Sequence, residues 1–343
     1  MFAFLIGLPG RFTERCEALV TALAEQALGP MGLIRADTLA QISRNVLANG
    51  ASHAVVTSRQ AGQRLRAALV DTEQNFIVAV DDPRKAVADL VTGDGVPFAE
   101  AVRRVASSCG ALTGYITAAG ALVLSPGIRP PKEVTTALMI GRHLRLPLNE
   151  AEVAAVRRRS MSLMASVAGP GNDAGSQGLD AAEAQILQAA LGPYLELPAI
   201  NEAVPIGWAP ELFLRGERSS EPAAGPIDIT GRPRCLFSGP HIFLPSGSWS
   251  LALALNISRE AAEHEFVAEL MTDAPLASGT IRPRAEGPAE IHLDFVLPEL
   301  ADHPVSLKLS TRRAAFDGAI GLLGATLTRA DGAADEASTP AQP

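Results

Sequence analysis

The stretch Asn75-Phe-Ile-Val-Ala-Val-Asp-Asp-Pro-Arg-Lys-Ala-Val-Ala-Asp89 decides the fold of the first half of the chain. Residues 76–80 are an uninterrupted apolar run, which is typical of a strand buried on both faces of a parallel sheet. Asp82 is a good N-cap residue and Pro83 fits a first helical turn, so we expect a helix over 84–91. A buried strand that turns directly into a helix is the repeating unit of α/β proteins.

The same alternation of strands and helices extends over residues 1–160. Further strands are predicted over 2–6, 53–57 and 121–124. Further helices are predicted over 11–27, 37–47, 61–69, 97–108 and 135–144. The first 160 residues therefore predict an α/β domain with a parallel sheet flanked by helices.

Residues 161–226 predict a helical and irregular connector between two domains. Turn-forming residues fill 164–178, a short helix is expected over 180–191, and 205–226 is again irregular. Trp208, in this last stretch, is either an exposed interaction residue or a cover for the domain junction.

From residue 227 the apolar residues recur with period two, which indicates β-strands. Strands are predicted over 248–257, 264–271, 281–285, 290–297, 305–310 and 320–329. The first of these places Trp249 and the alternate Leu and Ile residues up to Ile257 on one buried face. We therefore expect a β-sandwich of jelly-roll type over 227–330 and a disordered tail over 331–343.

The composition limits the class of partner. The chain has 343 residues and a formal net charge of −8, which argues against a nucleic-acid or anionic-membrane partner. No apolar run is long enough to span a bilayer and no cleavable leader is recognised, so we expect a cytoplasmic protein without membrane insertion. Cys16, Cys109 and Cys235 are too widely spaced to predict a disulfide framework or a metal site.

A glycine turn follows the first strand and opens the first helix, in the sequence Gly7-Leu-Pro-Gly-Arg-Phe-Thr13. Such a turn presents backbone N–H groups and a helix N-terminus to an anion. Taken with the strand and turn of residues 75–89, it resembles the two donor-binding motifs of sulfotransferases. Gly7, Pro9 and Thr13 match the family loop, whereas Gly10 stands where the family has a cation and Phe12 where it has a small residue.

Three charged residues depart from the sulfotransferase pattern. Asp81 and Asp89 occupy the positions of the arginine and serine that hold the donor's 3′-phosphate. Arg59 falls on the family's general-base histidine, and a guanidinium cannot accept a proton. The resemblance thus implies the fold of a sulfotransferase without its usual donor site, while Asp82-Pro-Arg84 also has the structural role of starting a helix.

Three hypotheses for the function follow. The leading one is a degenerate sulfotransferase-like protein, without catalytic residues or cofactor, that serves as a binding or scaffold component in bacterial surface-polysaccharide or glycan biosynthesis, with a saccharide ligand or protein partners. The second is an active sulfotransferase that uses 3′-phosphoadenosine 5′-phosphosulfate and a saccharide acceptor. The third is a protein-assembly module that uses the β-sandwich.

For an active sulfotransferase, the resemblance implies a set of catalytic and donor-binding residues. The catalytic candidates are Arg11, Glu14 and Asp82. The candidates for holding the donor are Gly7, Pro9, Gly10, Arg11, Thr13, Arg15 and Arg84.

Overall fold

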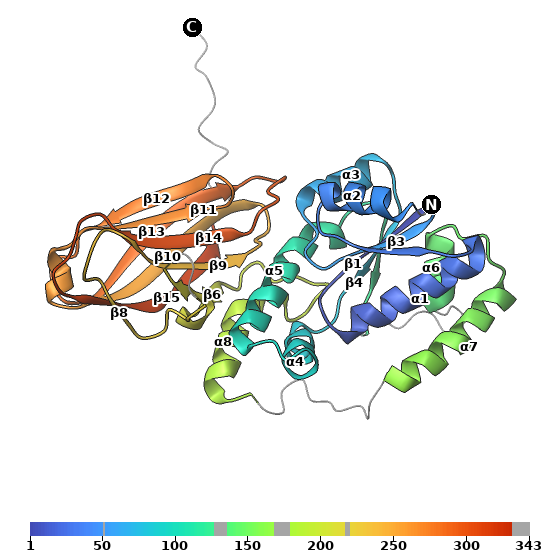
Figure 1. Cartoon of the computed structure of the whole chain (residues 1–343), viewed down its shortest axis with the longest axis horizontal. Coiled ribbons are helices and arrows are strands. Elements are labelled where there is room, and N and C mark those ends of the chain that lie inside the picture. The colour runs from blue at the N-terminus through green and yellow to red at the C-terminus, as the bar shows by residue number, and fades with distance from the viewer. Residues whose placement is uncertain (51, 127–135, 168–178, 217–219, 331–343) are drawn as a thin grey trace, which may run out of the picture. The chain divides into compact units, whose positions relative to one another are not determined.

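The computed structural model describes residues 1–50, 52–126, 136–167, 179–216 and 220–330. The chain divides into two units, Met1–Glu183 with Tyr194–Ile200, and Ala184–Pro193 with Asn201–Pro343 (Figure 1). The turn-rich segment predicted over 164–178 is wrong at its start, because a helix continues to Val167; its remainder and the predicted tail lie outside the described residues. No helix within the described ranges is long and apolar enough to cross a membrane.

The first unit is built on a parallel five-stranded sheet with the order β2-β3-β1-β4-β5. Its strands are β1 (Phe2–Gly7), β2 (Gly32–Arg35), β3 (Ala54–Ser58), β4 (Phe76–Ala79) and β5 (Ala121–Leu124). The central strands are buried on both faces, which explains their continuous apolar sequence. Only β2 is absent from the sequence prediction.

Helices cover both faces of this sheet (Figure 1). They are α1 (Arg11–Leu28), α2 (Leu39–Asn49), α3 (Gln63–Asp71), α4 (Pro83–Gly93), α5 (Phe98–Ile116), α6 (Thr136–His143) and α7 (Glu150–Val167). One face carries α1, α6 and α7, which pack on sheet residues such as Leu5 and Ile77. The other face carries α3, α4 and α5. Helix α5 extends well beyond the predicted end at 108 because Leu112 and Tyr115 continue its buried stripe.

The sheet order creates a crevice at the carboxyl ends of β1 and β4. The chain leaves β1 toward β2 on one side of the sheet and leaves β4 toward β5 on the other. Ligands of open α/β sheets bind where two neighbouring connections diverge in this way. The glycine turn and the Asp81-Asp82 turn therefore meet at the position where this architecture places a ligand.

The second unit is a β-sandwich of two antiparallel sheets, with the orders β13-β10-β15-β6 and β12-β11-β14-β9-β7; β8 also pairs with β15. Its strands are β6 (Ile206–Trp208), β7 (Leu214–Arg215), β8 (Pro226–Asp228), β9 (Cys235–Ile242), β10 (Gly247–Ile257), β11 (Phe266–Met271), β12 (Pro275–Ile281), β13 (Gly287–Leu297), β14 (Val305–Thr311) and β15 (Ala319–Arg329). Two short 3-10 helices lie between strands, η2 (Pro210–Leu212) and η3 (Glu260–Glu263). The helix α8 (Ala181–Leu191) and the 3-10 helix η1 (Gly192–Tyr194) each contain residues of both units. The predicted combination of an α/β fold and a β-sandwich is confirmed.

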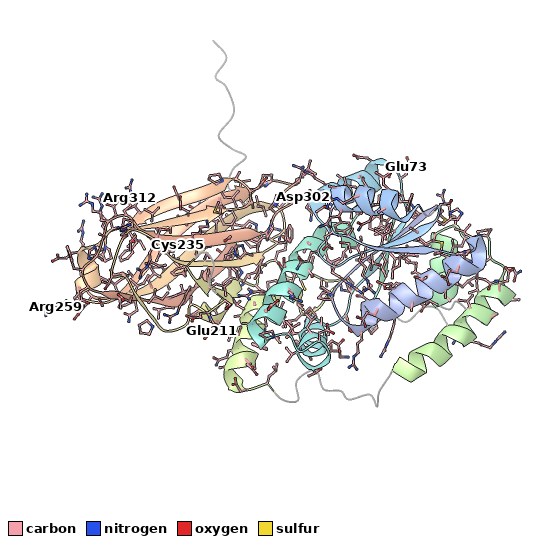
Figure 2. All side chains as sticks on the ribbon, in the orientation of Figure 1. Glu73, Glu211, Cys235, Arg259, Asp302 and Arg312 are labelled. Atoms are coloured by element: carbon pink, nitrogen blue, oxygen red, sulfur yellow. The ribbon has the colours of Figure 1, made fainter. Side chains whose placement is uncertain are left out.

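One strand prediction in the sandwich is wrong, and the strands β6, β7, β8 and β9 were not predicted; β6 and β7 lie in the stretch 205–226, which is therefore not irregular throughout. The strand expected over 281–285 instead ends at Ile281, because Pro283 follows and cannot donate to a ladder. Strand β9 was not predicted, since its Gly239-Pro240 pair is typical of a turn. Cys235, at the start of β9, is half-buried (Figure 2).

The two tryptophans belong to the core of the second unit. Trp249 faces inward as predicted, is 4% exposed, and donates from Nε1 to the Pro245 carbonyl oxygen at 3.0 Å. Trp208 lies on β6, is 1% exposed and makes an edge contact with Phe213 at a centroid distance of 6.3 Å. The hypothesis that Trp208 is an exposed interaction residue is therefore wrong, because its side chain is buried on β6, a strand that pairs with β15.

Glu265 makes the second unit sensitive to acid. Its carboxylate accepts hydrogen bonds from Arg312 Nη1 at 2.7 Å and Arg282 Nε at 2.6 Å (Arg312 is labelled in Figure 2). The bond from Arg312 lowers the pKa of Glu265, burial opposes this effect, and the bond from Arg282 lowers the pKa further. The unfolded chain therefore binds the proton more readily than the folded chain does.

We expect this stabilisation to be complete above the ordinary glutamate pKa of about 4.3 and to be lost as the pH falls through the lower folded pKa. Tryptophan fluorescence during urea unfolding at a series of pH values measures the effect, because both tryptophans lie in the second unit. Glu265→Gln should be less stable at neutral pH and should show a flatter acid dependence. Glu269→Gln, at an exposed position of β11, is the control. Identical pH profiles for wild type and Glu265→Gln would contradict the prediction.

Candidate functional site

The glycine turn is held by contacts within the protein. Gly7 ends β1, and a Cβ added there would lie 2.5 Å from Thr13 Cγ2 and 2.9 Å from the Ala79 carbonyl oxygen, so only glycine fits. Thr13 is 1% exposed and its hydroxyl donates to the Leu8 carbonyl oxygen at 2.6 Å. Pro9 lies half-buried in the turn. Thr13 thus fixes the loop and directs its hydroxyl into the protein.

The N-terminus of α1 already has an anion bound to it. Gly10 is its N-cap, with φ of 129°, and offers no side-chain hydrogen bond to the helix. The carboxylate of Asp89 on α4 fills this place instead: Oδ2 accepts from the Arg11 backbone N–H at 2.9 Å, and Oδ1 lies 3.6 Å from Arg11 Nε. A carboxylate at a helix N-terminus contributes about 0.3–1 kcal/mol. Asp89 therefore takes the place that a ligand phosphate takes in an anion-binding turn.

The turn after β4 is similarly neutralised by its own residues. Asp82 caps α4 by accepting from the Arg84 backbone N–H at 2.9 Å, and its two oxygens also bind Arg84 Nε and Nη2. Burial raises the pKa of Asp82, but the bonds from Arg84 outweigh it, so the net pKa is lowered. Burial raises the pKa of Asp81, with partial relief from the Asp82 backbone N–H. Arg84 is therefore committed to Asp82.

Arg59, at the position of the family histidine, contacts the back of the glycine turn. Its Nη1 donates to the Leu8 carbonyl oxygen at 3.3 Å, and its Nη2 lies 3.7 Å from Glu17 Oε2. Glu17 also accepts from Arg35 Nη2 at 2.9 Å, and its side chain is only 9% exposed. Arg59 thus joins the loop to a buried carboxylate.

The remaining candidates lie on the first turns of α1. Glu14 and Arg15 are exposed, and no hydrogen bond or ion pair with a described residue fixes either side chain. Cys16 beside them is buried, and burial raises the pKa of its thiol to about 12, so it carries no reactive thiolate. The structure thus brings Gly7, Gly10, Arg11, Thr13 and Asp89 into contact, and it leaves Glu14 and Arg15 at the surface.

Two residues of this region escaped the sequence analysis. Glu17 is an acidic residue in phase with the buried face of α1, which was a detectable signal. Asp37 follows β2, and its Oδ1 accepts from Ser58 Oγ at 2.6 Å and from the backbone N–H groups of Arg59 and Gln60 at 3.0 Å each. Its place directly before the capping box of Thr38 and Gln41 was a weaker signal.

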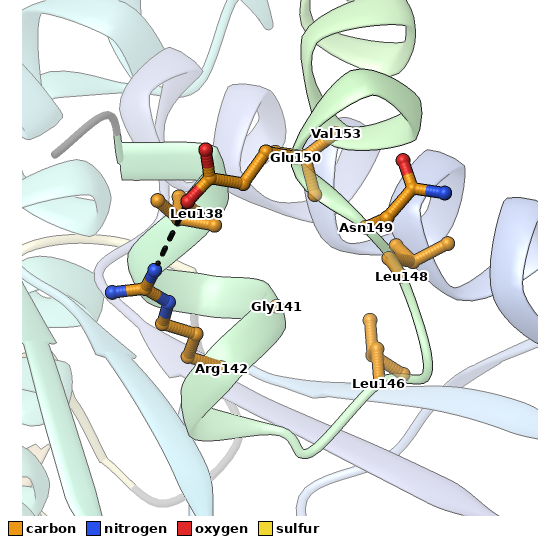
Figure 3. Close-up of a pocket in the computed structure, with 8 residues that line it drawn as sticks. All are labelled: Leu138, Gly141, Arg142, Leu146, Leu148, Asn149, Glu150 and Val153. Atoms are coloured by element: carbon orange, nitrogen blue, oxygen red, sulfur yellow. Dashed lines mark hydrogen bonds and ion pairs between the residues drawn. The ribbon is translucent and has the colours of Figure 1, made fainter.

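A separate hollow of about 280 Å³ lies between α6 and α7 (Figure 3). Apolar residues such as Leu138 and Val153 line it, and Arg142 Nη2 pairs with Glu150 Oε1 at 3.3 Å on its rim. Arg145, after α6, and Arg157 and Arg158, on α7, are exposed. Within the described ranges, no group of three His, Cys, Asp or Glu residues could hold a metal ion.

Fold and site together define an α/β unit with a parallel sheet and a glycine turn, on one chain with a β-sandwich. Among solved structures, the chain is similar to a mouse sulfotransferase complexed with PAP, at 12% identity and a TM-score of 0.34 over 50% of this chain and 68% of that one. It is also similar to a xylan-binding domain of carbohydrate-binding module family 22, at 15% identity and a TM-score of 0.23 over 36% of this chain and 93% of that one.

A third similar structure is the C-terminal family 22 module of Clostridium thermocellum Xyn10B, at 16% identity and a TM-score of 0.21 over 34% of this chain and 80% of that one. No protein-family model and no curated protein sequence matches the chain. Similarity at this level assigns no role to any residue.

Proposed function

We propose that this chain is a non-catalytic protein with a sulfotransferase-like domain, and that it acts as a binding or scaffold component in bacterial surface-polysaccharide or glycan biosynthesis. The observation that carries the proposal is the Asp89 carboxylate at the N-terminus of α1, 2.9 Å from the Arg11 backbone nitrogen. A donor phosphate at this helix end would have to displace that carboxylate. The α/β unit and the β-sandwich lie on one chain, and this supports a role in which one unit binds a ligand and the other a partner.

Electrostatics at the crevice disfavour the usual sulfuryl donor. Sulfuryl transfer, like phosphoryl transfer, needs cations placed around equatorial oxygens. Here Arg11 pairs with Asp89 and Arg84 pairs with Asp82. At an effective dielectric constant of about 20, a carboxylate at about 4 Å from a phosphate charge opposes binding by about 4 kcal/mol before screening. An affinity loss of more than about a hundredfold follows from one such contact.

In an active transferase at this crevice, the candidate catalytic and donor-binding side chains would have to break their present hydrogen bonds within the protein. Asp82, as a base, would have to leave Arg84, and Thr13, as a donor ligand, would have to give up its buried bond to Leu8. Glu14 is exposed and therefore available, but it has no fixed orientation. The proposal accordingly assigns no catalytic residue.

In the sandwich, sugar recognition would rest on hydrogen bonds more than on ring stacking. Among the described residues of 201–330, Phe316 is 98% exposed, whereas the other aromatic side chains are buried. Apart from the exposed Val296, the outward positions of β10 and β13 carry small and polar residues, such as the facing pair Ser250 and Asp294. A saccharide ligand in this proposal therefore meets a polar face.

Calorimetry with 3′-phosphoadenosine 5′-phosphate tests the proposal. The wild-type chain should show no binding up to about 1 mM. The double variant Asp81→Arg with Asp89→Ser, which supplies the family's residue types, should gain measurable binding, because it removes two like charges and adds a cation. Asp94→Ser, at the exposed C-terminal end of α4, is the matched control and should not bind. Micromolar binding by the wild-type chain would overturn the proposal.

A further inference from the structure

A second cavity of the first unit lies at the carboxyl ends of β2 and β3, beside α2. Its volume is about 350 Å³, which is at the small end of the range for ligand pockets and suits one monosaccharide. It is lined by Arg35, Ala36, Asp37, Gln41, Asn45, Thr57 and Arg59. None of these residues belongs to the glycine turn or to the turn after β4.

Two guanidinium groups give this cavity its anion-binding character. Arg35 and Arg59 both lie on Glu17, with Nη2 to carboxylate oxygen distances of 2.9 Å and 3.7 Å, so one buried carboxylate holds two cations in place. No described residue bonds to Nε or Nη1 of Arg35, whose side chain is 70% exposed. The Asp37 carboxylate also lines the cavity, so the two guanidinium groups face two carboxylates in all, and Nε and Nη1 of Arg35 are the charged donors left for a ligand carboxylate.

Thr57 supplies an independent indication of a ligand. It is 2% exposed, lines the cavity, and is the register partner of Arg35 in the sheet. Its Oγ1 atom is buried and has no hydrogen-bond partner. A buried hydroxyl without a partner costs about 1–3 kcal/mol, and such groups in folded proteins normally have one. A hydroxyl of a bound molecule would satisfy it.

The other polar groups of the cavity favour a ligand that also carries hydroxyls. Asp37 Oδ1 accepts from three donors, whereas no described residue donates to its Oδ2, which can accept from a ligand hydroxyl. Gln41 uses its carbonyl oxygen for the backbone N–H groups of Asp37 and Thr38, which leaves its amide nitrogen as a donor. Asn45 donates only a long bond of 3.5 Å to the Arg35 carbonyl oxygen.

We propose that this cavity binds a monosaccharide-sized sugar acid, whose carboxylate pairs with Arg35 and Arg59 and whose hydroxyls bond to Thr57, Gln41 and Asn45. The proposal is independent of whether the crevice between β1 and β4 holds a donor. It assigns a binding site and no reaction.

Titration calorimetry of the full chain with sodium glucuronate is the test, with glucose and inorganic phosphate as comparison ligands. Glucuronate should bind with Kd below about 1 mM. Glucose lacks the carboxylate and phosphate lacks the ring, so each should bind at least about tenfold more weakly.

Variants locate the site. Arg35→Gln should weaken glucuronate binding by about tenfold to a hundredfold, since it removes a charged hydrogen-bond donor. Thr57→Val keeps the shape of the side chain and should weaken binding by about threefold to tenfold, yet leave the ligand-free chain as stable as wild type or more stable. Arg142→Gln, at another exposed arginine in an ion pair, is the control and should bind as wild type does.

Three results would overturn the proposal. The first is no glucuronate binding up to about 10 mM by a folded wild-type chain. The second is equal binding of glucose or phosphate. The third is unchanged binding in both Arg35→Gln and Thr57→Val. A destabilised Thr57→Val without ligand would show that the hydroxyl has a partner within the protein, which also contradicts the proposal.

Discussion

Gly7→Ala should lower the free energy of unfolding of the first unit by about 2–4 kcal/mol. The added methyl group would lie 2.7 Å from Thr13 Oγ1 and 2.9 Å from the Ala79 carbonyl oxygen. Rotation of Thr13 does not relieve the clash, because its hydroxyl is bonded to Leu8 and because the carbonyl belongs to the backbone of β4. Strand β1 would have to move away from β4, with which it pairs.

The helical circular dichroism signal during urea unfolding measures this effect. Except for α8, the described α-helices lie in the first unit, and the second unit adds only short 3-10 helices, whereas the tryptophans lie in the second unit. The helical transition should shift to lower urea while the fluorescence transition stays where it is. Gly141→Ala is the control: apart from its chain neighbours and the backbone of its own helix, no atom lies within 4 Å of the added methyl group, so it should be neutral or stabilising by about 0.5–1 kcal/mol. Equal stability of the two variants would refute the steric argument.

Asp37→Ala should destabilise the same unit by about 2–3 kcal/mol. One carboxylate oxygen accepts from the Ser58 hydroxyl and from two successive backbone N–H groups, and hydrogen bonds to a charged acceptor are stronger than neutral ones. Loss of the acceptor leaves the turn after β3 with donors that lack a partner. That turn also carries Arg59, so its disorder would reach the back of the glycine turn.

Asp37→Asn separates charge from geometry. Its amide oxygen can still accept, so we expect about half of the loss seen in Asp37→Ala. Helical circular dichroism again measures the first unit. A free energy of unfolding for Asp37→Ala within about 0.5 kcal/mol of wild type would show that the three bonds contribute little.

Local sequence signals were sufficient for the strongly patterned elements. The run Ala121–Leu124 was placed with its observed bounds because Gly120 and Ser125 interrupt the pattern on both sides. Strand β2 gave no signal, since Ile34 is its only buried residue, and neither alternation nor an apolar run marks it. In β9, Gly239 and Pro240 masked a strand that tertiary pairing with β14 and β7 maintains.

The sequence predicted which two turns form the candidate site, but it did not predict the contacts that fill it. The resemblance located the glycine turn and the turn after β4, and the sheet order brings them together as such folds require. The bond between Asp89 and the Arg11 backbone joins positions 78 residues apart, so no local pattern reveals it. The unpartnered hydroxyl of Thr57 likewise depends on packing among β2, β3 and α2.

The contact between Asp89 and the start of α1 also restricts the order in which a donor site could arise by mutation. Asp81→Arg introduced first would place a new cation in a crevice where Asp89 is still present, and the two charges would attract each other. The substitution would then hold the Asp89 carboxylate more firmly in the crevice, and the affinity for a donor would not rise. Asp89→Ser introduced first frees the helix end, after which Asp81→Arg adds a cation for the phosphate. Stepwise gain of donor binding at this position is therefore expected when Asp89→Ser precedes Asp81→Arg, and not when the order is reversed.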